Sequence, residues 1–152
     1  METRRRLVCL GLLGLVACAA GRSAVPAPVL GTTVVEVAGV SLTVEVADTP
    51  DLRERGLMER SALRPDHGMV FVYPDERQRS FWMKNTPLPL SIAYIDSQGR
   101  IVHMADMTPF DTSPVPSRRP AMYAIEVEQG WFDRKAVRVG DKVEGLPPPS
   151  SR

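Results

Sequence analysis

Short runs of β-branched residues, each closed by a turn, most constrain how this chain can fold. The clearest pair, residues 32–37 and 40–46, alternates Val or Leu with polar residues and is joined by Ala38-Gly39. Alternation with a period of two places one side of each run against a core, and a two-residue connection containing Gly is typical of a β-hairpin. The sequence therefore predicts a hairpin at the start of the folded part.

Six further segments have strand character and follow one another at short intervals. We expect residues 78–83 to pair with the apolar run 69–73, whose strand should end at Pro74, and residues 121–128 to form another strand. Seven or eight short strands in 152 residues indicate one mainly β domain of compact, jelly-roll-like barrel or sandwich form. The predicted strands are residues 32–37, 40–46, 69–73, 78–83, 91–96, 100–107, 121–128 and 139–143.

One or two short helices should interrupt the strands. Asp48 or Thr49 can cap a helix and Pro50 suits its first turn, so we expect a helix that reaches about Met58. Its charged residues 53–55 should form a solvated face. A second turn or short helix is expected over residues 130–132.

Three segments carry no strand or helix pattern. Residues 108–120 contain four prolines and predict a long loop, of the kind that is often functional or mobile. Residues 18–31 are rich in Ala, Pro, Ser and Gly, as in a flexible linker, and residues 146–152 predict a disordered tail. The β domain should therefore span residues 32–145.

Residues 1–17 predict a signal peptide of the lipoprotein type. Three arginines at 4–6 precede an apolar run over residues 7–16 that is too short to be a permanent membrane span. The run ends in Leu-Val-Ala before Cys18, which resembles a lipobox, so Cys18 is the expected lipidation site, carrying acyl chains such as palmitate. The alternative is a plain signal peptide cleaved near residues 17–20, which would release a soluble secreted protein.

These features place the protein outside the cytoplasm and narrow its chemistry. We expect an exported lipoprotein of the periplasm or outer membrane, attached to the membrane through its N-terminal lipid. Lipidation of Cys18 would leave no thiol in the mature chain, which excludes a cysteine nucleophile or a thiolate zinc site. The chain has 19 Lys and Arg against 18 Asp and Glu, so we expect no nucleic-acid partner, and we expect a monomer.

Several short motifs are similar to those of a known family and span nearly all of residues 40–143. They are VEVADTP at 44–50, RGLM at 55–58, GMVF at 68–71 and, most distinctive, FWMKNT at 81–86. The chain resembles the small bacterial and archaeal family filed as domain of unknown function 192. The resemblance implies a compact jelly-roll-like β domain, often secreted, and implies no activity. Where the family usually has Asp after Pro-Leu, this chain has Ser91, which leaves any role of that carboxylate in doubt here.

The FWMKNT stretch is the candidate ligand site. Trp82, Lys84, Asn85 and Thr86 combine an indole, an ammonium, an amide and a hydroxyl near a strand end, a mixture that can hold a carboxylate, a sugar or a peptide end. The alternative is structural: the amide and hydroxyl would satisfy turn backbone groups, the indole would lie in the core, and the lysine stem would cover apolar surface.

Other chemistry has weaker support. His67 and His103 are the only histidines, too few for a typical zinc site without added Asp ligands, and the six methionines after residue 17 suit core packing better than copper binding. Asp96, Asp106 and Glu126 are candidates for a paired-carboxylate site of the glycosidase type. We expect no metal and no cofactor.

We therefore interpret the chain as a lipid-anchored extracytoplasmic domain that binds a small ligand or envelope component near residues 81–86. Two alternatives stay open. One is a hydrolase of envelope polymers that uses paired carboxylates. The other is a structural accessory of a membrane assembly, which would show an exposed apolar patch and no pocket.

Overall fold

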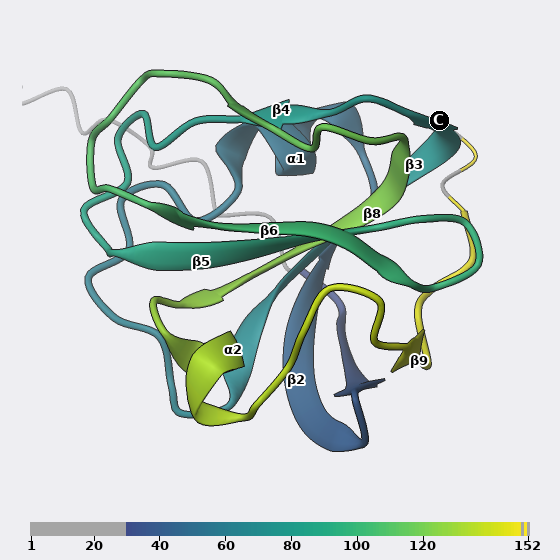
Figure 1. Cartoon of the computed structure of the whole chain (residues 1–152). Coiled ribbons are helices and arrows are strands. Elements are labelled where there is room, and N and C mark those ends of the chain that lie inside the picture. Colours follow the sequence, from purple (N-terminus) through teal and green to yellow (C-terminus); the bar gives the residue numbers. More distant parts are fainter. Residues whose placement is uncertain (1–29, 150, 152) are drawn as a thin grey trace, which may run out of the picture.

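The structure, a computed structural model, describes residues 30–149 and 151, so the predicted signal peptide, Cys18 and most of the predicted linker lie outside the described residues. The prediction of a mainly β fold with one or two short helices is confirmed (Figure 1). The strands are β1 (Thr32–Val37), β2 (Val40–Ala47), β3 (His67–Arg77), β4 (Ser80–Phe81), β5 (Leu90–Ile95), β6 (Ile101–Met107), β7 (Val115–Pro116), β8 (Ala121–Glu128) and β9 (Val143–Glu144). The helices are α1 (Pro50–Arg55) and α2 (Trp131–Arg134).

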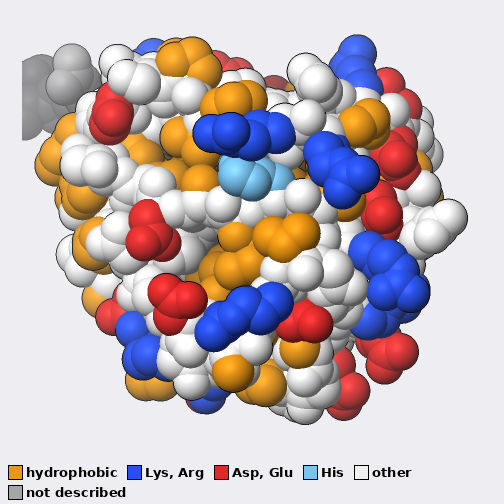
Figure 2. Space-filling view, viewed as in Figure 1, with side chains coloured by type: hydrophobic (Ala, Val, Ile, Leu, Met, Phe, Trp, Pro, Cys, Tyr) orange, Lys and Arg blue, Asp and Glu red, His pale blue; other side chains and the backbone are white. Residues whose placement is uncertain are grey.

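Seven of these strands form one curled sheet in the order β6-β5-β8-β3-β2-β1-β9, and β4 pairs with β7. The curl brings the two edges together: the Ile101 amide donates to the Asp141 carbonyl at 3.0 Å, and the Gly140 amide donates to the Ile101 carbonyl at 2.8 Å. The sheet is therefore a half-barrel. Figure 2 shows acidic, basic and hydrophobic side chains mixed over one side of the molecule.

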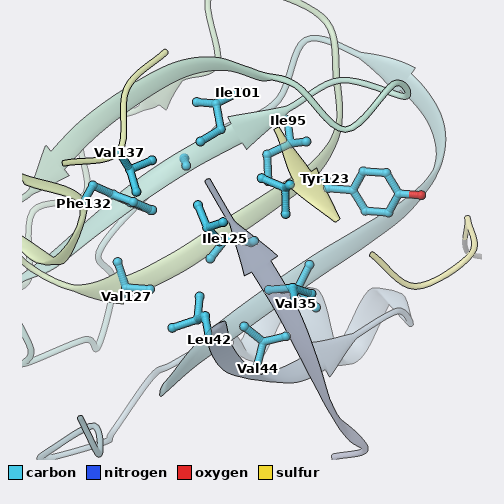
Figure 3. Packing of buried hydrophobic residues seen from close by; sticks show 14 of the residues in the cluster. Val35, Leu42, Val44, Ile95, Ile101, Tyr123, Ile125, Val127, Phe132 and Val137 are labelled. Carbon is cyan, nitrogen blue, oxygen red and sulfur yellow. The ribbon is translucent and has the colours of Figure 1, made fainter. Parts of the chain in front are cut away.

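Both faces of the sheet are covered by apolar side chains. Inside the curl, side chains from β1, β2, β5, β6, β8 and α2 point towards one another (Figure 3). On the outer face a second cluster includes Met69, Phe71, Ile92 and Tyr94, covered by α1 and by the loops around β4 and β7. Because both faces are buried, all six residues of β5 are buried, which is expected for a central strand between two apolar layers.

The predicted hairpin and helix cap are confirmed. Ala38 and Gly39 both have positive φ, 51° and 80°, as a two-residue turn between twisted strands requires. The Thr49 side chain accepts from the Leu52 amide at 3.3 Å and caps α1. The helix is shorter than predicted, because the chain leaves it at Gly56 with φ 47°.

The predicted partner of the 69–73 strand is wrong. β3 does not end at Pro74 but runs to Arg77, and its neighbours are β2, which is parallel, and β8, which is antiparallel. Residues 78–83 could not pair there because both edges of β3 are already occupied; only Ser80–Phe81 is extended, against β7. The predicted 108–120 loop therefore contains a short strand.

The segment after β9 contacts the domain. Leu146 packs against the cluster inside the curl, and the Tyr123 hydroxyl donates to the Pro147 carbonyl at 3.1 Å. In the part of the chain that the structure describes, no helix has the length and apolar character needed to cross a membrane.

Candidate functional site

A cleft of about 220 Å³ lies between α1 and β4. Figure 1 shows these two elements next to each other at one end of the molecule, over β3 and β8. Four aromatic residues form much of its wall, with Glu126 of β8 among the lining residues. We call this site the Glu126 cleft. The wall aromatics are Phe71, Tyr73, Phe81 and Trp82.

The position of Glu126 follows from the alternation along β8. Ile125 and Val127 point into the half-barrel, so Glu126 points to the outer face, where its cross-strand neighbours are Met69 and Ile92. Glu126 is only 4% exposed to solvent. A carboxyl group surrounded by apolar side chains on both sides is unusual unless it is paired or functional.

No described residue supplies a hydrogen bond or an ion pair to the Glu126 carboxyl. Within residues 30–149, no side-chain nitrogen or oxygen that is sealed from solvent lacks a partner. The unpartnered oxygens of Glu126 must therefore reach the surface of the cleft that this residue lines. The carboxyl group is thus buried in apolar surroundings and open to one small space.

Burial raises the pKa of Glu126 to about 8, because the apolar surroundings penalise the charged form. At pH 7 the empty cleft therefore holds mainly the protonated carboxylic acid. Such a group can donate a hydrogen bond or can ionise when a counter-charge arrives. Perturbed carboxyl groups in clefts are candidates for function.

The aromatic wall is anchored by ring contacts. The Phe81 ring stands edge-on to Phe71 at 4.8 Å between centroids and to Tyr94 at 5.7 Å. Next to it, Trp82 is 46% exposed, and the Lys84 Nζ atom lies 5.2 Å from the centre of its ring. The indole is therefore a wall of the cleft and not a buried core residue.

Arg53 corrects the prediction that the charges of α1 form a solvated face. Its Nη1 atom donates to the carbonyls of Asp48 at 2.7 Å and Val72 at 2.8 Å, and its guanidinium lies 4.9 Å from the centre of the Tyr73 ring. Arg79 lies 3.9 Å from the centre of the same ring. No local pattern pointed to these contacts, because α1 ends at Arg55 and its six residues show little periodicity.

The structure divides the four candidate ligand residues. Trp82 and Thr86 line the cleft, whereas Lys84 and Asn85 do not. Asn85 is exposed, has a left-handed φ of 53°, and its carbonyl accepts from the Glu59 amide at 2.8 Å. The Thr86 hydroxyl donates to the Lys84 carbonyl at 3.1 Å. These contacts give Asn85 and Thr86 turn-forming roles, and ligand contacts by these four residues stay a prediction.

The structure does not bring together the three acidic residues predicted to form a paired-carboxylate site, Asp96, Asp106 and Glu126. The Asp96 carboxylate accepts from the Gln98 and Arg100 amides in a turn, and Asp106 accepts from the Ser91 hydroxyl at 2.5 Å. Neither lines the Glu126 cleft; the second acidic residue that does is Glu54 of α1, which sequence analysis did not select.

Ser91, at the position where the family usually has Asp, is structural here. Its hydroxyl oxygen accepts from the Gly130 amide at 2.9 Å while the hydroxyl donates to Asp106. The two histidines are used locally: one His67 ring nitrogen lies 2.8 Å from the Pro65 carbonyl, and the His103 ring stacks on Tyr94. Within residues 30–149 no three His, Cys, Asp or Glu side chains are grouped as a metal site would need.

A larger hollow of about 620 Å³ lies beside β1 and β2, and two of the charged residues that line it are paired with each other. Arg60 and Glu45 form a two-pronged ion pair there, with Nη2 to Oε2 at 2.6 Å. This contact raises the pKa of Arg60. The Glu126 cleft is the stronger candidate, because its carboxyl group is buried and has no partner among the described residues.

Comparison with known proteins adds a family and two structures. Residues 33–145 match the family DUF192, described as uncharacterised. A crystal structure from Sinorhizobium meliloti 1021, described as a "putative transcription regulator", has 37% identity and a TM-score of 0.73, over 76% of this chain and 94% of that one. A protein of unknown function from Novosphingobium aromaticivorans DSM 12444 has 31% identity and a TM-score of 0.73, over 88% of this chain and 99% of that one. No curated protein matches.

Proposed function

This chain belongs to the uncharacterised family DUF192, and from its geometry we propose that the domain binds a small ligand or envelope component in the Glu126 cleft. The observation that carries the proposal is a carboxyl group, buried and without a partner among the described residues, at the surface of a space with aromatic walls. Ligand sites usually combine apolar or aromatic walls with a small number of placed polar groups, and this cleft has both kinds of lining residue.

The size of the cleft limits what can enter it. Its volume of about 220 Å³ is below the range of roughly 300–1,000 Å³ that is typical of sites for whole drug-sized ligands. The cleft therefore suits one head group or chain end of a larger molecule. Trp82, which lines the cleft and is 46% exposed, could contact the remainder of such a ligand.

We also propose that the domain is held at the membrane by acyl chains on Cys18. The support is the order of arginines, apolar run and small residues before that cysteine. Growth with labelled palmitate should mark the wild-type protein and leave the Cys18→Ser variant unmarked. An unmarked wild-type protein in the same experiment would contradict the anchor without affecting the cleft.

The binding proposal is tested on the full-length protein extracted from its own envelope in mild detergent and examined by native mass spectrometry. We expect an added mass on the wild-type protein that is lost in Trp82→Ala and in Glu126→Gln. Glu36→Gln is the control, because it makes the same chemical change at an exposed strand position outside the cleft. An added mass that is equal in all four proteins would refute the site.

A second candidate, a hydrolase of envelope polymers, has one observation in its favour. Glu126 and Glu54 line the same cleft, and a carboxyl group whose pKa is about 8 can serve as a general acid near neutral pH. Release of sugars from purified envelope polymers by the wild-type protein, lost in Glu54→Gln and in Glu126→Gln, would favour this candidate over simple binding.

We do not carry the description of the Sinorhizobium protein over to this one. Sequence-independent binding to nucleic acid needs a concentration of basic side chains. Here 19 basic residues face 18 acidic ones, and both kinds are mixed over the face shown in Figure 2.

A further inference from the structure

We infer that the group that enters the Glu126 cleft is an organic cation, an ammonium group with or without methyl substituents, held between the Glu126 carboxylate and the rings of the wall. This inference deepens the proposed binding function and rests on it. It concerns the charge of the ligand, which the size and location of the cleft do not determine.

The first argument is the missing counter-charge. Glu126 is 4% exposed and receives no hydrogen bond or ion pair from any described residue, although it reaches the cleft surface. The nearby cations are directed elsewhere: Arg53 Nη1 binds two backbone carbonyls, and Arg79 binds Asp75 and the Ala121 carbonyl. A cationic ligand would supply the partner that the protein itself does not place there.

The second argument is that the wall of the cleft consists of aromatic rings that can bind a cation. An ammonium group is attracted to the face of Trp, Tyr or Phe within about 6 Å of the ring centre. The protein already uses two wall rings in this way, with Lys84 over Trp82 at 5.2 Å and Arg79 over Tyr73 at 3.9 Å. Burial raises the pKa of Tyr73, which keeps its phenol neutral. These rings are therefore placed where cations can approach them, next to a carboxyl group.

Other ligand charges fit less well. An anion would find one cation among the lining residues, Arg53, whose Nη1 atom is already bound to two backbone carbonyls, and it would be repelled by Glu54 and by Glu126 once that group ionises. A neutral sugar would leave an ionised Glu126 without a counter-charge, and one hydroxyl that lines the cleft, that of Thr86, is engaged with the Lys84 carbonyl. A cation needs only the carboxylate and the rings.

The charge is tested by calorimetry on the wild-type protein with three kinds of probe. The cations are choline and methylammonium, 3,3-dimethylbutan-1-ol is the uncharged isostere of choline, and acetate is the anion. We expect at least one cation to bind ten-fold or more tightly than the alcohol and the acetate. Equal binding of choline and its isostere, tighter binding of acetate, or binding of neither cation would overturn the inference.

The second readout is the release of a proton when the cation binds. A bound cation should ionise Glu126, whose proton passes to the buffer, so the heat of binding should change with the ionisation enthalpy of the buffer. Affinity should rise about ten-fold from pH 6 to 7 and level off above pH 8. The other charged or titratable groups near Glu126 are Tyr73, Tyr94, Arg53, Arg79 and Glu54. Absence of proton release on cation binding would overturn the inference.

Variants separate this inference from the function on which it rests. Glu126→Gln should bind choline and its isostere equally and release no proton, whereas Glu36→Gln should behave as wild type. Trp82→Ala should weaken cation binding while leaving proton release intact, which checks the wall independently of the carboxylate. If the envelope extract shows a Trp82-dependent ligand but no cation binds, the binding function stands and the cationic ligand is refuted.

Discussion

Glu126→Gln should stabilise the empty protein, and the gain should depend on pH. The substitution keeps the shape of the protonated side chain and removes its titration. The physical basis is that the folded protein holds a carboxyl group at 4% exposure without a described partner, while the unfolded chain exposes it to water. Ionising Glu126 therefore costs more in the folded state than in the unfolded one.

The magnitude follows from the pKa. Burial raises the pKa of Glu126 from its ordinary 4.5 to about 8. Between these values the folded state keeps a proton that the unfolded state has released, so the free energy of unfolding of the wild type falls as pH rises. At about 1.4 kcal/mol per pH unit, the penalty is near zero below pH 4.5, about 3 kcal/mol at pH 7 and on the order of 5 kcal/mol above pH 8.

The assay is urea unfolding of wild type, Glu126→Gln and Glu36→Gln at several pH values from 4 to 9. The difference in unfolding free energy between Glu126→Gln and wild type cancels the pH dependence of all other groups. We expect it to grow by about 3 kcal/mol from pH 4.5 to 7, which corresponds to roughly 10–15 °C in Tm for a domain of this size. A difference that stays constant over this range would refute the buried, unpaired carboxyl group.

The remaining predictions concern the scaffold and use the same measurement. Gly56→Ala should cost about 1–2 kcal/mol, because φ is 47° and an added Cβ would lie 3.3 Å from a Phe71 ring carbon; Gly31→Ala, with nothing within 4 Å, is its control. Ser91→Ala should cost about 1–3 kcal/mol because it breaks two hydrogen bonds, and no loss would contradict this role. Arg60→Met should cost about 1 kcal/mol at low salt and less in about 1 M NaCl, since its ion pair is only partly buried; a salt-independent loss would indicate packing instead.

Local features of the fold were predictable because they depend on neighbours in sequence. The turn at Ala38-Gly39, the cap at Thr49 and the alternation over residues 121–128 each involve a few adjacent residues. The strands that pair with β3 were not predictable. Strand pairing depends on how all seven strands of the sheet pack between the two apolar layers. β2 and β3 pair in parallel, and no short sequence pattern in the segment between them predicts this pairing.

The candidate site was only partly predictable for the same reason. Trp82 and Thr86 could be selected from their residue types, and both line the cleft. Glu126 was selected as a carboxylate but grouped with Asp96 and Asp106, which are engaged elsewhere. Arg53 was assigned to solvent because a six-residue helix shows little periodicity.

By itself, the amino-acid sequence determined the family, the mainly β fold, the first hairpin and the stretch where a site could lie, since these depend on residue type and local spacing. Only the tertiary structure decided that Glu126 is buried without a described partner beside an aromatic wall. That environment is built by α1, β3, β4 and β8, which are distant in the chain, and the energy of a carboxyl group depends on all the atoms around it.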